Sequence, residues 1–112
     1  MSGDAQSSTP IRSECASDPD MAELVAEFVG ELPDKSQTLN AALQQSQFAD
    51  LQRLSHQLKG ACGGYGFPQL GEAAAKLEAR LKQLDAQPKL DAVEDVTRQV
   101  NELVELCRRA SV

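Results

Sequence analysis

Apolar residues recur at helical spacing in four stretches of this chain, and this periodicity constrains the fold more than any other feature of the sequence. Steps of three and four residues bring the apolar side chains of each stretch to one side of an α-helix. Strand signals are absent, and Ala, Leu, Glu and Gln, which favour helices, dominate the composition. The sequence therefore predicts an all-α chain.

The first helix is predicted to begin at Asp18. Asp is a favourable N-cap residue, and Pro19 suits the first helical position. Pro33 lacks a backbone N–H and should kink or end the helix, although the apolar pattern resumes after it. We therefore expect either a bent first helix or two short ones. The apolar stripe consists of Met21, Leu24, Val25, Phe28, Val29 and Leu32, followed by Leu39, Ala42 and Leu43.

Three further helices are predicted: one at about 48–64, one that begins at Pro68 and is stopped by Gln87 and Pro88, and one at about 90–109. A Gly cluster at 63, 64 and 66 ends the first of them, Pro68 suits the start of the next, and Pro88 separates the last two. Each helix has a single apolar stripe and the connections are short, so an antiparallel up-and-down four-helix bundle would bury all the stripes together. The stripes are Leu51, Leu54, Leu58, Ala61 or Cys62, and Tyr65; Leu70, Ala73, Ala74, Leu77, Leu81 and Leu84; and Leu90, Val93, Val96, Val100, Leu103 and Cys107.

The length of 112 residues fits one domain, which we expect to span residues 18–110. Residues 1–17 mix Ser, Gly, Asp and Thr without a sustained period, which is typical of a tail or leader. If part of this segment packs against the domain, Ile11 is the residue expected to anchor it.

Charge and hydropathy exclude several function classes. The formal net charge is −6, so a nucleic-acid backbone would be repelled and no nucleic-acid partner is expected. No apolar run approaches the ~18 to 20 residues that a membrane span requires, and the N-terminus lacks the apolar core of a signal peptide. We therefore expect a cytoplasmic protein without a membrane partner. The bundle has no obvious second apolar face, which favours a monomer.

The three cysteines are Cys15, Cys62 and Cys107. Their spacing contains no C-x-x-C pair that would indicate a zinc site or a redox couple, so they are predicted to be free thiols. Cys62 and Cys107 fall on apolar stripes, and core packing explains them better than reactivity does.

His56 is the only histidine of the chain, and it falls nearly opposite the apolar stripe of its helix. It is therefore expected to face solvent. Lys59, Gly60 and Gly63 follow at three, four and seven positions and share its helix face. Gly in a helix interior costs ~1 kcal/mol relative to Ala. With Gly60 and Gly63 on one exposed face, no side chain would cover the helix surface beside the imidazole, and another protein could approach it closely.

An exposed imidazole beside an ammonium suits attack on an anionic phosphoryl group, because the ring is a nucleophile and the ammonium attracts the anion. Structural explanations stay open at this point: Gly60 could permit close helix packing, Gly63 could belong to the helix terminator, and Lys59 could be solvated charge. A zinc site lacks companion ligands. A hydrolase triad is unsupported, because Ser55 points elsewhere on the helix.

The string His56-Gln57-Leu58-Lys59-Gly60-Ala61-Cys62-Gly63-Gly64-Tyr65-Gly66 resembles the H-x-L-K-G-x-x-x-x-x-G signature of histidine-containing phosphotransfer (HPt) domains. The segment Phe67-Pro68-Gln69-Leu70 with Ala73, Leu77 and Glu78 is similar to the third helix of that family, and residues 18–32 are similar to its first helix. The resemblance thus covers most of the chain.

This resemblance implies that His56 accepts a phosphoryl group from an aspartyl phosphate on a receiver domain and passes it to the aspartate of another receiver. Lys59 would steady the phosphoryl oxygens or the partner's acidic pocket, and Gly60 and Gly63 would keep the approach open. Glu78 stands where some members carry a Gln that hydrogen-bonds the imidazole. If it faces His56, it would orient the ring.

The implied partners are receiver domains of response regulators and of hybrid sensor histidine kinases, in a bacterial-type phosphorelay. Gln52, Arg53, Gln57 and Gly63 are the expected docking residues. Leu24 and Phe28 are alternatives for docking, although core packing explains most of that helix better. Mg²⁺ is expected on the receiver, and no cofactor is expected on this chain. ATP-binding glycine motifs are missing, so a phosphocarrier is predicted and not a kinase.

The competing hypothesis is a helical docking or adaptor bundle that binds a receiver domain or another protein without accepting phosphate. His56 discriminates the two hypotheses. A pure binder should tolerate its replacement by Gln, whereas a phosphocarrier should lose all function.

Overall fold

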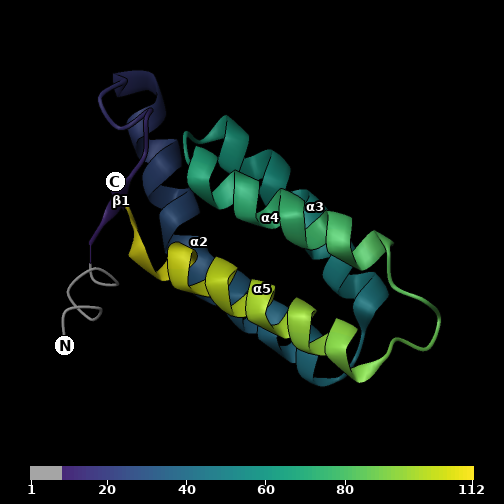
Figure 1. The fold of residues 1–112 in the computed structure, drawn as a ribbon. Helices are drawn as coiled ribbons and strands as arrows, with labels where there is room; N and C mark the ends of the chain where they lie inside the picture. Colours follow the sequence, from purple (N-terminus) through teal and green to yellow (C-terminus); the bar gives the residue numbers. More distant parts are fainter. Residues whose placement is uncertain (1–8) are drawn as a thin grey trace.

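The computed structural model describes residues 9–112 and contains four long helices and two very short strands (Figure 1). Each helix contacts its neighbours along the chain, and the last helix closes the bundle against the first. The predicted all-α, up-and-down four-helix bundle is therefore confirmed. The elements are β1 (Ile11–Arg12), α2 (Pro19–Gln44), α3 (Phe48–Gly64), α4 (Pro68–Lys82), α5 (Leu90–Arg109) and β2 (Ala110–Ser111).

Helix α2 begins where the sequence predicts. Asp18 is its N-cap, and its side-chain Oδ1 accepts a hydrogen bond of 3.0 Å from the backbone N–H of Asp20. The helix then continues through Pro33 without interruption, so the alternative of two short helices is wrong, whereas the bend at Pro33 stays a prediction. Burial of Leu32 and Leu39 on either side of Pro33 holds both halves to the core, which offsets the ~3 kcal/mol cost of an interior proline.

The core contains residues from all four helices and is completed by Phe67 in the turn between α3 and α4. Three expected members of the stripes lie outside it: Leu24 is 45% exposed, Leu90 is 74% exposed, and Val93 is only partly buried. Leu90 is the first residue of α5, and no preceding helical turn covers it. The fully buried large side chains are Val25, Leu32, Leu39, Leu51, Phe67, Leu70, Leu77, Val96, Val100 and Leu103.

The cysteines of the described residues are free thiols, as predicted. Cys62 and Cys107 are buried in the core, and burial raises the pKa of their thiols to about 12 and about 11. Both thiols are therefore protonated at neutral pH and serve as packing groups.

The segment before α2 packs along the end of the bundle. Strand β1 pairs in parallel with β2, with Ile11 opposite Ala110, so the expectation that the chain forms no strand is wrong here. Two-residue strands are too short to produce a periodic signal. Ile11 packs against the core, which confirms it as an anchor. The domain boundary at residue 18 stays a prediction, and residues 1–8 of the predicted tail lie outside the described residues.

This segment also holds the turn that follows α3. The buried Ser13 donates its hydroxyl hydrogen to the Tyr65 carbonyl at 2.6 Å, and the Glu14 N–H donates to the Gly66 carbonyl at 2.8 Å. Gly66 has a φ of +83°, and a Cβ there would lie 2.8 Å from the Cys15 nitrogen. The final Gly of the signature is thus needed for the turn and for its contact with the N-terminal segment.

Within residues 9–112, no helix combines the length and the apolar character needed to cross a membrane.

Candidate functional site

His56 lies on the outer face of α3, and 66% of its side-chain surface is exposed. This confirms the exposure predicted from the helical wheel. The opposite face of α3 carries Leu51, Leu58 and Cys62 into the core. Ser55 is also buried, and its hydroxyl donates to the Leu51 carbonyl at 2.8 Å. Ser55 is therefore committed to its own helix and takes no part in the site around His56.

Glu78 on α4 lies directly beside the imidazole. Its Oε2 is 2.8 Å from Nδ1 of His56, and only 6% of the Glu78 side-chain surface is exposed. This position follows from the packing of α3 against α4, which have the most extensive contact of any two helices. Glu78 immediately follows Leu77 at the edge of the buried stripe of α4, so its carboxylate emerges between the two helices.

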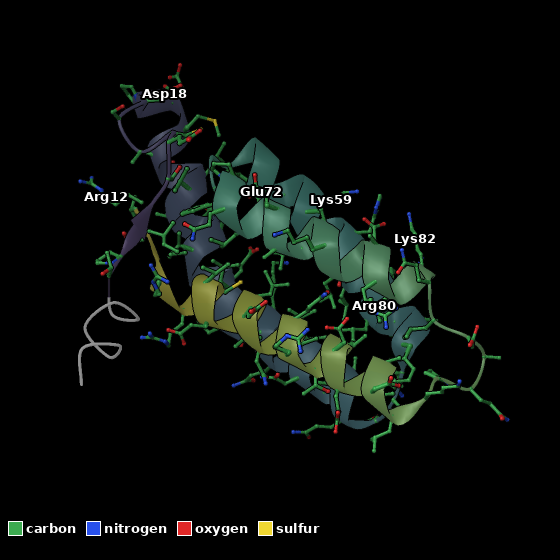
Figure 2. The ribbon with its side chains drawn as sticks, viewed as in Figure 1. Arg12, Asp18, Lys59, Glu72, Arg80 and Lys82 are labelled. Carbon is green, nitrogen blue, oxygen red and sulfur yellow. The ribbon has the colours of Figure 1, made fainter. Side chains whose placement is uncertain are left out.

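Two lysines also contact the Glu78 carboxylate. Lys59 Nζ lies 2.8 Å from Oε1, and Lys82 Nζ lies 3.4 Å from Oε2. Figure 2 shows Lys59 and Lys82 along the same side of the α3–α4 pair, whereas Arg80 lies toward α5. Arg80 is paired there with Asp95, at 2.8 Å. Glu78 is thus the centre of a small charged cluster that consists of His56, Lys59, Glu78 and Lys82.

The lysines keep the Glu78 carboxylate ionised. The hydrogen bond from Lys59 is the main cause that lowers the pKa of Glu78 to about 2, against the opposing effect of burial. Hydrogen bonds with His56 and Lys82 lower this pKa further. An ionised carboxylate can only accept hydrogen bonds, so the nitrogen that faces it, Nδ1 of His56, must carry the hydrogen. The lone pair of the neutral ring is then on Nε2, which has no hydrogen-bond partner among residues 9–112.

Gly60 and Gly63 are exposed within α3, on the turns that follow His56. A Cβ at either position would meet no atom within 4 Å. Close helix packing therefore does not require Gly60, and Gly63 does not adopt the positive φ of a helix terminator, which occurs at Gly66. What both glycines provide is an uncovered backbone on the approach to the imidazole.

The other expected docking residues lie in two places. Gln52 and Arg53 line a shallow hollow together with His56 and Glu78, and Arg53 forms an ion pair of 3.5 Å with Asp50. Gln57 is exposed on the other side, where it borders a hollow between α2 and α3. The structure therefore brings Gln52 and Arg53 to the imidazole and Gln57 to the side of α2.

Phe28 belongs to the core, because its ring is buried and stacks on Tyr65 at a centroid distance of 4.7 Å. Leu24 lies one turn earlier on α2 and is exposed. Lys82 is the member of the charged cluster that sequence reasoning missed. Its signal is the spacing of four residues after Glu78, which places both side chains on one face of α4.

These features define a class of protein: a helical bundle that presents one exposed, nucleophilic imidazole nitrogen beside cationic groups. Among residues 9–112, no three His, Cys, Asp or Glu side chains gather in a way that could hold a metal ion. The model of the Hpt domain family matches residues 23–110, and the chain belongs to this family. Hpt domains carry phosphoryl groups on histidine in phosphorelays, interact with receiver domains of two-component systems, and are phosphocarriers and not kinases. Searches of curated proteins and of solved structures found no significant match.

Proposed function

We propose that this protein is a phosphorelay intermediate that accepts a phosphoryl group on Nε2 of His56 from a receiver-domain aspartyl phosphate and passes it to the aspartate of another receiver. The observation that carries the proposal is the 2.8 Å contact between Nδ1 of His56 and the ionised Glu78. This contact fixes the tautomer whose free lone pair lies on the other ring nitrogen.

The proposed transfer requires no proton to leave the site. The Nε2 lone pair forms a bond to phosphorus while the bond between phosphorus and the aspartyl oxygen breaks, and the aspartate departs as a carboxylate. The ring keeps its Nδ1 hydrogen and gains a positive charge, which Glu78 stabilises through the existing hydrogen bond. Passage to the second aspartate is the same step in reverse. Positioning of the two reactants supplies most of the catalysis.

Lys59 and the glycines serve the same step. Lys59 is on the same face of α3 as His56, so its ammonium can reach the oxygens of a phosphoryl group on Nε2. Gly60 and Gly63 leave room for the receiver to bring its aspartate to the imidazole. Gln52, Arg53 and Gln57 are the proposed docking contacts around this opening.

The partners in this proposal are receiver domains of response regulators and of hybrid sensor histidine kinases. The receiver supplies the Mg²⁺ that neutralises the phosphoryl oxygens during transfer, and this chain supplies the nucleophile. The chain itself would act as a monomeric phosphocarrier without ATP-dependent kinase activity. The proposed setting is the cytoplasm of a bacterium, where free thiols stay reduced.

The test is incubation of the full chain with an isolated receiver domain that carries an aspartyl phosphate, followed by intact-mass measurement and an acid-lability assay. We expect one added phosphoryl group that is lost in acid and is absent from the His56→Gln variant. Binding of several phosphorylated receivers without any transfer would contradict the proposal and support the docking bundle instead.

A further inference from the structure

Two lysines, Lys59 and Lys82, contact the single carboxylate of Glu78. One ammonium would already balance the negative charge of this carboxylate. Lys59 Nζ contacts Oε1 at 2.8 Å, whereas Lys82 Nζ contacts Oε2 at the longer distance of 3.4 Å. The His56 hydrogen bond is also made to Oε2. The carboxylate is thus well paired by Lys59 and His56 before Lys82 is counted.

Phosphorylation would place a second anion beside Glu78, so two anions would then require cations. In the proposed function, His56 gains a doubly negative phosphoryl group on the ring that Glu78 already contacts. Two anions so close together repel each other unless a cation lies with each of them. Lys59 is the cation that can reach the phosphoryl oxygens from α3, but in the resting protein its ammonium is on Glu78.

We propose that Lys82 is a positioning residue that takes over the Glu78 carboxylate when Lys59 turns to the phosphoryl group. The proposal rests on the phosphocarrier function of His56. Lys82 follows Glu78 by four residues on α4, so it stays beside the carboxylate whatever Lys59 does. Its side chain is 58% exposed, which leaves it free to shorten the 3.4 Å contact.

The other cations near the site form ion pairs with other acids or lie away from Glu78. Arg80 is bound to Asp95 of α5 at 2.8 Å, and Arg53 is paired with Asp50 within α3. Lys76 lies on α4 but lines the groove between α4 and α5. Lys82 is therefore the cation of α4 that can stay paired with the Glu78 carboxylate when Lys59 contacts the phosphoryl group.

The exchange is separate from the covalent step. The bond between Nε2 and phosphorus forms as the aspartyl oxygen–phosphorus bond breaks, and neither lysine gains or loses a proton. Lys59 only moves from one anion to another, and Lys82 keeps Glu78 paired. Without Lys82, each move of Lys59 would leave a nearly buried carboxylate with His56 as its sole partner, so Lys59 would be held on Glu78.

The first experiment measures phosphoryl transfer from a phosphorylated receiver to the full chain carrying Lys82→Met, Lys82→Arg or Lys76→Met. Lys76→Met is the matched control, because it removes the same charge from the same helix away from the cluster. We expect Lys82→Met to slow transfer by roughly threefold to tenfold, and both Lys82→Arg and Lys76→Met to transfer at close to the original rate.

A double-mutant comparison separates this role from a structural one. If Lys82 acts through Lys59, Lys82→Met should slow transfer in the original chain but have almost no further effect in a Lys59→Met background. Equal slowing in both backgrounds, or transfer by Lys82→Met at the original rate, would overturn the proposal.

A second measurement does not depend on any receiver. Phosphoramidate can phosphorylate the imidazole directly, and NMR of the lysine ammonium groups then reports where Lys59 lies. We expect the Lys59 signal to move on phosphorylation in the original chain and to stay in Lys82→Met. A Lys59 signal that moves equally in both would refute the exchange. The Lys59 signal could move only when Lys82 is present, while no receiver transfers a phosphoryl group to the chain. That combination would contradict the phosphorelay function and still support the role of Lys82.

Discussion

At the scale of single residues, the site depends on one carboxylate that is nearly buried and yet ionised. Glu78 is held in that state by Lys59, His56 and Lys82, and it in turn determines which nitrogen of the imidazole carries the hydrogen. A neutral side chain at this position could still accept a hydrogen bond, but it would not stabilise the positive charge that the ring gains in the proposed transfer. Glu78 is therefore the residue whose titration should be visible in the folded protein.

Glu78 should make part of the stability of the bundle dependent on acid pH. Its pKa is about 2 in the folded protein against an ordinary value of 4.5, so its contribution is complete above about pH 4.5 and is lost as the pH falls toward 2. The groups that face its carboxylate are His56, Lys59 and Lys82. Urea denaturation across this window should show a steeper loss of stability in the original chain than in Glu78→Gln. Parallel curves would contradict the charged cluster.

At the scale of the elements, α3 contains an exposed interior glycine, which lowers the stability of the helix and leaves part of its surface open. Gly60 lies in the helix interior, and an added Cβ would meet nothing within 4 Å. Gly66, two residues after the end of α3, is the opposite case, because its positive φ and the Ser13–Cys15 segment leave no space for a side chain. The two glycines of the signature are therefore expected to respond to the same substitution in opposite ways.

Gly60→Ala should stabilise the bundle by up to about 1 kcal/mol, because Ala is the better helix former and has room. The larger Gly60→Leu should slow phosphoryl transfer without unfolding the bundle, because it covers the approach to His56. Gly30→Ala on α2 is the matched control, since its Cβ also meets nothing within 4 Å. It should stabilise similarly and leave transfer unchanged. Thermal denaturation and the transfer assay test this, and normal transfer by Gly60→Leu would disprove the steric role.

Gly66→Ala should destabilise the protein by roughly 2–4 kcal/mol, from the strained positive φ and the contact with Cys15 and Ser13. Part of this loss arises from release of the N-terminal segment. Ser13→Ala in the Gly66→Ala background should therefore cost less than Ser13→Ala alone. Additive losses, measured by chemical denaturation, would show that the two positions are independent.

At the scale of the whole molecule, the charges are segregated between two layers. Helices α3 and α4 lie together on one side of the bundle, and α2 and α5 lie on the other (Figure 1). The cations Arg53, Lys59, Lys76, Arg80 and Lys82 outnumber the acids of α3 and α4. The acids of α2 are Asp20, Glu23, Glu27, Glu31 and Asp34, against the single cation Lys35. An acidic chain thus presents its histidine on its least acidic layer.

This segregation should steer an acidic partner site toward the His56 layer. Association with a receiver is therefore expected to slow by several-fold when the ionic strength rises from about 0.05 M to 0.5 M, because salt screens the attraction. Arg53→Gln should weaken this salt dependence, whereas Lys35→Gln on α2 should affect it less. Stopped-flow association rates test both, and a rate that rises with salt would contradict steering.

Local periodicity and capping are enough to predict the helices and the face of α3 on which the histidine lies. The bounds of α3 and α5 and the exposure of His56 could be derived from spacing, Pro and Gly alone. Spacing alone could not show that Leu24 and Leu90 stay exposed, since burial depends on which element covers a stripe.

The residues of α4 that lie beside the imidazole depend on the tertiary structure. Glu78 is 22 residues from His56 in the chain, and the two meet because α3 and α4 pack in one particular register. That register also brings Lys59 to the carboxylate, and it makes Lys82 a member of the cluster. The pairing of β1 with β2 and the continuity of α2 through Pro33 were likewise decided by packing. Contacts between residues far apart in the chain depend on the folded register, which no local pattern encodes.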